Sequence, residues 1–203
     1  MNQYLTLVLK SAGYGSFTTN LLTIPAYCIF ILNLLFWCFL SEKINERFLL
    51  CTISQIWVLP LLIALETLPI TRSPWATWIL SVLIYAMPYV HPLIVAITSR
   101  NAGTVRTRTV ASALYNMMVQ PSNIIGSNIY RTPDSPFYFT GNKVLIGLVC
   151  HNICLFVGAK VFYVTVNRRR ERTWNAMTKS EKEDYLSTTT DKGNKRLDFQ
   201  FAH

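Results

Sequence analysis

The sequence predicts an all-α polytopic membrane protein. Of its 203 residues, 51% are apolar and 14% are charged, whereas charged residues make up roughly a quarter of ordinary soluble domains. The charges also gather at one end, because residues 167–203 hold nine of the 19 lysines and arginines and six of the ten acids. The rest of the chain therefore contains long uncharged runs, and about 20 helical residues cross the roughly 30 Å core of a bilayer.

Five segments reach this length, and each is predicted to be a transmembrane helix. They are residues 17–40, 48–70, 75–98, 109–130 and 144–166. Three of them carry no acidic or basic side chain, while the second contains only Glu66 and the fifth only Lys160. Both side chains are predicted to reach toward the headgroups.

The third segment combines a polar stripe with two prolines. Tyr85 lies on this stripe and is a candidate for lining a substrate path, and Pro88 and Pro92 continue the stripe at helical spacing. Because proline lacks the N–H that a helix needs, the pair predicts a bend or break that frees backbone carbonyls. Such carbonyls are tolerated inside a membrane only where protein or water can bond them. His91 is a candidate proton-handling group, and the alternative is a histidine that is simply hydrogen-bonded to a neighbouring helix.

The fourth segment is the least apolar of the five. Asn116, Gln120 and Asn123 are spaced four and three residues apart, so they fall on one stripe of a helix. Polar side chains inside a membrane often mark a substrate path, and these three are candidates for one. The alternative is that the amides only tie helices together. Ser122 and Gly126 form a pair of small residues four apart, which predicts that another helix packs closely there.

The distribution of lysine and arginine predicts the orientation. Nine of them lie in the connections after the first and third segments and at the start of the tail, and four lie in the other connections. Positive residues near spans stay on the cytoplasmic side. The C-terminus is therefore predicted to be cytoplasmic and residues 131–143 to face outside, provided that the fourth segment crosses the membrane.

The two ends flank a predicted bundle of residues 17–166. Residues 1–16 are interpreted as the remnant of a truncated helix and an outer loop, with a short amphipathic anchor as the alternative. Residues 167–203 are predicted to be a cytoplasmic tail. In it, Thr178 and Glu181 have capping-box spacing, which predicts a short helix from Lys179 to about Leu186 and a mobile segment after it.

Four stretches carry a resemblance to a known family. The short charged loop SEKINER resembles the loop between the second and third helices of each half of a major facilitator superfamily transporter, where an acid precedes a base. Here the pair is Glu42-Lys43 in place of the commoner Asp-Arg. The stretches FTTNLLTIPAY, SNIIGSNIYRTPDSPFYFTGNK and WNAMTKSEKEDYLSTTTDKGNKRLDFQFAH resemble the fungal allantoate permease branch, also called the anion:cation symporters.

This resemblance implies that the chain is the C-terminal half of a major facilitator fold, with five full transmembrane helices and the end of a sixth. It implies that Glu42, Lys43 and Arg47 belong to a cytoplasmic gating loop. The implied function is proton-coupled symport of small organic anions of the allantoate, vitamin or sulfur-compound type, at the plasma membrane. Because the cavity of this superfamily lies between its two halves, the chain is expected not to transport alone.

The expected partners are the lipid bilayer, a small organic anion, and either a separate N-terminal six-helix half or an intact related transporter. A non-transporting fragment, left as a gene relic, that associates with intact relatives is the alternative, and a five-span protein of unrelated role is a third hypothesis. The sequence shows no phosphate loop, no zinc spacing and no nucleophile constellation. It therefore predicts no enzyme, no metal, no cofactor and no nucleic-acid partner.

Overall fold

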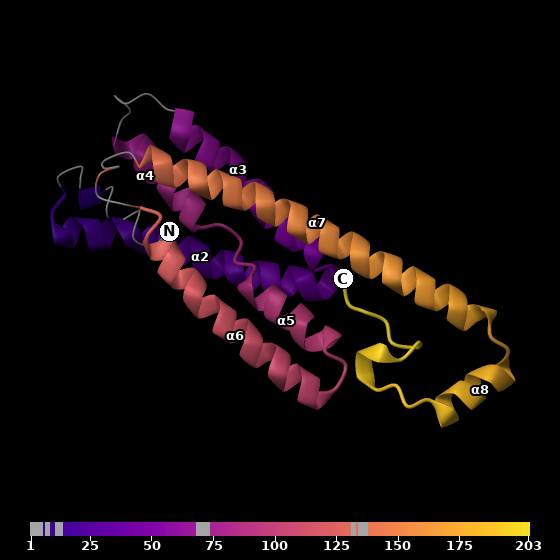
Figure 1. Cartoon of the computed structure of the whole chain (residues 1–203). Helices are drawn as coiled ribbons and strands as arrows, with labels where there is room; N and C mark the ends of the chain where they lie inside the picture. Colours follow the sequence, from indigo (N-terminus) through magenta and orange to yellow (C-terminus); the bar gives the residue numbers. More distant parts are fainter. Residues whose placement is uncertain (1–5, 7–8, 11–13, 68–73, 131–132, 134–137) are drawn as a thin grey trace.

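The computed structural model describes all residues except 1–5, 7–8, 11–13, 68–73, 131–132 and 134–137, and the regular elements in the described part are all helices (Figure 1). This confirms the predicted all-α class. The predicted remnant helix of residues 1–16 lies largely outside the described residues. In order, the elements are α2 (Ser16–Ile44), α3 (Phe48–Thr67), α4 (Pro74–Tyr85), α5 (His91–Asn101), α6 (Val105–Ser127), α7 (Phe139–Ala176), α8 (Lys179–Thr188) and the short 3₁₀-helix η2 (Gly193–Lys195).

Three of the predicted spans are confirmed as helices long and apolar enough to cross a membrane: α2, α3 and α7. The predicted span 75–98 is instead divided between α4 and α5. Helix α6 has 23 residues, about 35 Å at 1.5 Å per residue, so its length suffices. It is not among the three because its sequence is too polar, as expected for the fourth segment.

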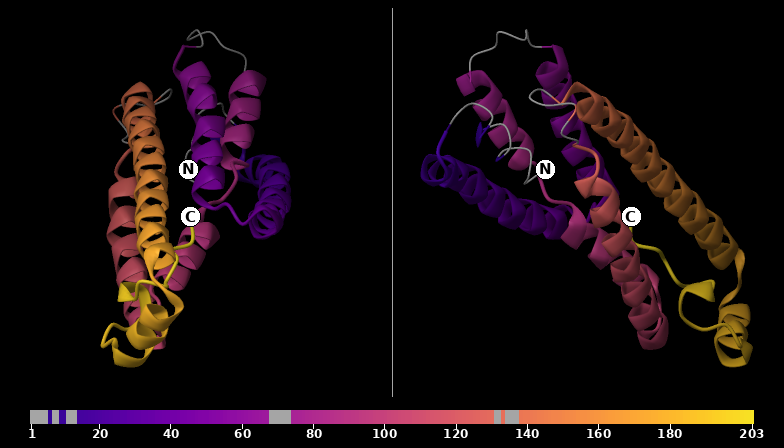
Figure 2. Two further views of the ribbon diagram at one scale, coloured as in Figure 1. Left: turned by 90° about the vertical axis from the view of Figure 1, so that its right-hand side faces the viewer. Right: turned by 60° about the vertical axis from the view of Figure 1, so that its left-hand side comes forward.

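Helix α3 is the centre of the bundle. In its most apolar stretch 44% of the residues are buried, against 6% in those of α2 and α7. Helix α7 packs along α3, α4 lies against both α2 and α3, and α5 pairs with α6 (Figures 1 and 2). The largest buried cluster joins α3, the end of α4 and the start of α7, and it consists of Val58, Leu62, Leu65, Ile84, Tyr138 and Val149.

Ion pairs fasten α7 alongside α3 at both ends. Lys160 of α7 lies 2.7 Å from Glu46 in the turn before α3, and Lys143 lies 3.6 Å from Glu66 near the other end of α3. The first pair joins the charged loop before α3 to helix α7. Glu66 of α3 therefore pairs with Lys143 of α7, and Lys160 of α7 pairs with Glu46 in the turn before α3, whereas the sequence predicted that Glu66 and Lys160 reach toward the headgroups. All four side chains are partly exposed, so each pair contributes at most about 1 kcal/mol.

Helix α7 continues well past the predicted end of the last span at residue 166. Its 38 residues are about 57 Å long at 1.5 Å per residue, nearly twice the bilayer core. The basic run RRRER contains no Gly or Pro, and arginine and glutamate are good helix formers, so the helix continues through it.

After α7 the predicted capping box is confirmed: Thr178 N donates to Glu181 Oε2 at 2.7 Å and Thr178 Oγ1 accepts from Glu181 N at 3.3 Å. Hydrogen bonds from the backbone and side chain of Thr178 hold the pKa of the Glu181 carboxyl below its usual value.

The last eleven residues fold back onto the bundle. The mobility predicted for residues 187–195 stays a prediction, and Asn194 within that segment donates to Asn101 O at 3.0 Å. Asn101 of α5 donates to Ala202 O at 3.1 Å and accepts from Ala202 N at 2.8 Å. Asn167 of α7 makes the same two-way pair with Phe201, at 2.8 and 2.9 Å. A side-chain amide carries both a donor and an acceptor, so it can bond a peptide as a neighbouring strand would. The tail thereby ties α5 to α7 at one end of the bundle (Figure 1).

The three basic connections meet at this same end, as the predicted alternation requires. Arg100 at the end of α5 donates to Asn45 Oδ1 after α2 at 3.5 Å, and the tail after α7 bonds Asn101. The assignment of this end to the cytoplasm is a prediction. In a variant whose native cysteines are replaced, a cysteine at Pro133 is expected to react with an impermeant maleimide on intact cells, and a cysteine at Ser187 only after permeabilisation. The reverse pattern would overturn the orientation.

Candidate functional site

The chain between α4 and α5 (residues 86–90) is not helical, which confirms the break predicted from the two prolines. Each proline lacks the N–H that would bond the carbonyl four residues earlier. Pro92 therefore leaves the Pro88 carbonyl without its helical donor, and Pro88 does the same to the Ile84 carbonyl. The Ile84 carbonyl accepts from Met87 N instead, at 3.3 Å.

Side chains of two other helices bond the carbonyls of this break. Ser54 Oγ of α3 donates to Pro88 O at 2.6 Å, and Asn33 Nδ2 of α2 donates to Ala86 O at 2.6 Å. Ser54 is fully buried, so its bond is shielded from competing water. The freed Pro88 carbonyl and the Ala86 carbonyl within the break are thus both bonded by protein side chains, one of the two cases that the sequence allowed. The break is therefore a supported feature, fixed from α2 and α3.

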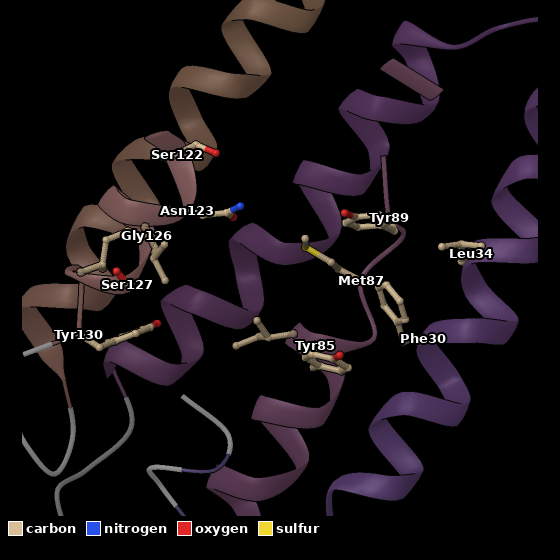
Figure 3. A pocket seen from close by; sticks show the side chains of 13 residues that line it. Phe30, Leu34, Tyr85, Met87, Tyr89, Ser122, Asn123, Gly126, Ser127 and Tyr130 are labelled. Atoms are coloured by element: carbon tan, nitrogen blue, oxygen red, sulfur yellow. The ribbon is translucent and has the colours of Figure 1, made fainter. Parts of the chain in front are cut away.

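A cavity of about 760 Å³ lies beside the break, between α2 and α6 (Figure 3). Its volume falls within the range of small-molecule sites. The α6 side is small and polar, and consists of Ser122, Asn123, Gly126 and Ser127. The remaining lining is mostly apolar or aromatic, and consists of Phe30, Leu34, Ile84, Tyr85, Met87, Tyr89, Ile129, Tyr130 and Leu145.

The lining is suited to hydrogen bonding without charge neutralisation. Among the described residues that line the cavity, none is acidic, basic or a histidine. The Asn123 amide and the serine hydroxyls supply donors and acceptors, and the aromatic rings supply apolar surface. Donors without a full opposite charge can hold an anion and still release it.

A row of aromatic rings connects the cavity to His91. Tyr85 lies 5.5 Å from Phe30, Phe30 lies 5.4 Å from Tyr89, and Tyr89 lies 5.7 Å from His91, measured between ring centroids. The His91 Nδ1 atom is hydrogen-bonded to the Tyr115 hydroxyl of α6 at 2.5 Å. The predicted alternative for His91, a bond to a neighbouring helix, is thus what the structure shows. The bond leaves its candidate role with protons open, because a hydroxyl can both accept and donate.

Comparison with known proteins finds fungal relatives of two lengths. The chain is 44% identical over 203 residues to the "Uncharacterized transporter YIL166C" of Saccharomyces cerevisiae. This match covers 100% of the chain and 38% of that relative. It is also 44% identical over 201 residues to the "Putative uncharacterized transporter YOL162W" of the same yeast, which covers 98% of the chain and 94% of that relative. The chain belongs to this family of fungal transporters.

Other comparisons find more distant relatives and do not identify a substrate. The family extends to Schizosaccharomyces pombe, where the "Uncharacterized transporter C11D3.18C" is 24% identical over 177 residues, 84% of the chain and 34% of the relative. No protein-family model and no solved structure matches the chain. The relatives are named as transporters and not as enzymes. The chain spans little more than a third of the longer relatives it matches.

The residues predicted to line a substrate path fall into two groups in the structure of this transporter-family chain. Tyr85 and Asn123 come from different helices and line the same cavity. Asn116 and Gln120 are exposed on α6 and lie outside that lining. They continue the stripe of Asn123 along the helix, and their role in a path stays a prediction.

The small-residue pair of α6 does not form the predicted helix contact. A Cβ atom placed on Gly126 would meet nothing within 4 Å, and Ser122 and Gly126 both face the cavity (Figure 3). The prediction of a closely packed helix at this pair is therefore wrong for the described residues, because the space beside Gly126 is open. Helix α6 has no buried residue at all.

The sequence reasoning missed the aromatic part of the site. Phe30, Tyr89 and Tyr115 were not singled out, although Tyr89 lies inside the stretch MPYVHP between the two prolines. An aromatic residue between the two prolines is a usable signal, because the break places it beside the same cavity as Tyr85. Phe30 and Tyr115 carry no such signal, since apolar helices are rich in aromatic residues.

The predicted gating residues lie at the end where the basic connections meet. Glu42 and Lys43 belong to the last turn of α2 and are exposed, whereas only 7% of Arg47 is exposed. The chain reverses at Asn45, whose left-handed backbone (φ 56°) lets its N–H bond Ser41 O at 3.0 Å. The gating role of this loop stays a prediction.

Proposed function

We propose that the chain forms one half of the transport pathway of a proton-coupled symporter for small organic anions, within the allantoate permease branch of the major facilitator superfamily. The observation that carries this is the helix break of residues 86–90, which opens beside a cavity lined from the four helices α2, α4, α6 and α7. Transporters commonly place substrate at such discontinuous helices near the middle of the membrane. Five helical segments would then cross the membrane, with α4 and α5 together forming the third.

The chemistry of the lining supports an anion of modest size. Asn123 and the neighbouring serines offer hydrogen-bond donors, and the rings of Phe30, Tyr85 and Tyr89 suit the apolar part of a substrate. A charged group that completes the site would come from the other half of the pathway. His91, bonded to Tyr115, is the group we assign to proton movement.

The exposed helices support the need for a further protein segment. Helix α6 has no buried residue, and α2 exposes a row of large apolar side chains that includes Phe17, Leu32 and Phe39. In a complete transporter, a segment equivalent to the rest of YIL166C would cover one of these faces. The same exposure favours a second candidate, a non-transporting fragment that associates with an intact relative at the plasma membrane.

A substitution in the cavity tests the proposed pathway. The chain is joined to the N-terminal portion of YIL166C, and uptake of labelled allantoate, nicotinate, pantothenate and biotin is measured. Asn123→Ala is expected to lower uptake of the transported anion about tenfold to a hundredfold, because one hydrogen bond to a charged ligand contributes about 1.5–3 kcal/mol. Surface expression should be unchanged.

Asn128→Ala is the matched control on the same helix. Asn128 is not among the residues that line the cavity of Figure 3, and its amide donates to Ile124 O at 2.9 Å and to Ser127 Oγ at 3.4 Å. This variant should keep uptake within about twofold of the parent, since it removes exposed bonds at the end of its own helix and no group of the lining. If Asn123→Ala instead reduces only the amount of protein and leaves uptake per molecule unchanged, the amide holds helices together and the assignment of the path is wrong.

A further inference from the structure

Two arginines meet in a second cavity, whose lining begins at Cys38, about one helical turn along α2 from Leu34 of the first cavity. This arginine pocket, of about 480 Å³, lies where α2 ends and α5 passes beside it. It contains Ser41, Glu42 and Asn45 from the end of α2, Arg47 from the turn before α3, and Arg100 from the last turn of α5. The pocket is at the end of the bundle that carries the basic connections.

Both guanidinium groups share one neutral acceptor. Arg47 Nη1 donates to Asn45 Oδ1 at 3.3 Å, and Arg100 Nη1 donates to the same oxygen at 3.5 Å. Within the described part of the chain, neither arginine forms an ion pair. Glu42 also lines the pocket, but its carboxylate oxygens lie more than 4 Å from the guanidinium nitrogens of both arginines. Two positive charges therefore converge on an amide that cannot neutralise them.

The burial of Arg47 makes this arrangement costly. Only 7% of Arg47 is exposed, and a buried charge without a direct ion-pair partner is unfavourable. Burial, and then the nearby charge of Arg100, lower the pKa of the Arg47 guanidinium, while Glu42 raises it. Arg47 also directly precedes α3, where its carbonyl accepts from Cys51 N at 2.9 Å. The positive end of that 20-residue helix adds to the field in the pocket.

We propose that the arginine pocket binds a phosphate group, held by Arg47 and Arg100 together. A guanidinium presents paired N–H donors that match phosphate oxygens, and a phosphate carries enough charge to balance both arginines. The pocket opens at the predicted membrane surface, so the phosphate comes either from a lipid headgroup or from free phosphate in solution. This inference is independent of the transport proposal, because none of its residues line the cavity beside the helix break.

The test uses the full chain purified in maltoside micelles, which contain no phosphate. One arm titrates inorganic phosphate by calorimetry, and the other adds phosphatidylinositol 4-phosphate and counts retained lipid by native mass spectrometry. Arg47→Gln and Arg100→Gln are each expected to weaken binding of the active probe at least about tenfold. Arg106→Gln, which removes an exposed charge at the start of neighbouring α6, should change it less than about twofold if the pocket and not general charge attracts the ligand.

Each outcome decides the proposal. Binding of inorganic phosphate that competes with the lipid identifies a free phosphate, and binding of the lipid alone identifies a headgroup; both support the site. The site is overturned if neither probe binds, or if Arg106→Gln weakens binding as much as Arg100→Gln. Since Arg47 is buried, its variant is checked for helix content by circular dichroism. Arg100 is exposed, so its variant keeps the test valid should Arg47→Gln fail to fold.

Discussion

Expressed without any relative, the chain is expected to give no concentrative uptake of organic anions, and joined to the N-terminal portion of YIL166C it is expected to restore uptake. The chain matches 38% of that relative, and the cavity beside the helix break is not enclosed by the described residues. An open site cannot alternate its access between two sides, which symport requires. Uptake of labelled anions into cells lacking YIL166C and YOL162W measures both cases.

Proton coupling gives this experiment a second arm. In the joined protein, an imposed pH gradient should drive accumulation, and His91→Gln, which cannot carry a proton, should abolish that drive while leaving exchange of labelled for unlabelled anion. Tyr115 can still bond a glutamine at this position, so the variant tests titration more than packing. Gradient-driven uptake by the purified chain alone in vesicles would refute the need for a second segment. Equal accumulation by His91→Gln would refute the role of the histidine.

The fold was predictable where one physical rule dominates locally. Apolar runs about as long as a bilayer is thick, with at most one charge each, predicted α2, α3 and α7, and the missing N–H groups of Pro88 and Pro92 predicted the break between α4 and α5. The capping box of α8 followed from two residues three apart. These features depend on neighbours in the chain, so a sequence displays them directly.

The rest depends on partners distant in the chain. Nothing in the sequence pairs Asn101 with Ala202 or Asn167 with Phe201, because an amide can bond any exposed peptide group. The continuation of α7 to Ala176 was missed for a different reason. The span was ended where the charges begin, but arginine and glutamate end a membrane crossing without ending a helix.

The candidate site shows the same division. Tyr85 and Asn123 were predicted from polarity within a membrane segment, and they line one cavity. The lining between them includes Met87 and Tyr89 of the break, whose position no local pattern in the sequence gives. Helical periodicity also placed Asn116 and Gln120 on the stripe of Asn123. It cannot say how far along that stripe a cavity extends, because that depends on where α2 and α4 end beside it.

Replacing Ser54 by alanine is expected to destabilise the bundle more than any other serine change in the described helices. Its hydroxyl supplies the donor that Pro92 cannot give to the Pro88 carbonyl. Without it, a buried carbonyl loses its partner, which costs about 1–3 kcal/mol. Cys51 lies one turn earlier on α3 and is fully buried. Its rate of reaction with a maleimide, in a variant lacking the other four cysteines, measures the opening of this region and should rise accordingly.

Ser81→Ala is the matched control, because Ser81 is also buried and also donates to a carbonyl. Its bond goes to Thr77 O at 2.7 Å within α4, and that carbonyl keeps the backbone N–H that an α-helix provides four residues later. Its loss leaves no orphaned acceptor, so the reaction rate of Cys51 should change less than about threefold, the equivalent of roughly 0.6 kcal/mol. Similar rates in the two variants would show that the Pro88 carbonyl has found another donor. In that case the break is not fixed from α3, and the cavity beside it lacks the rigid edge that a substrate site needs.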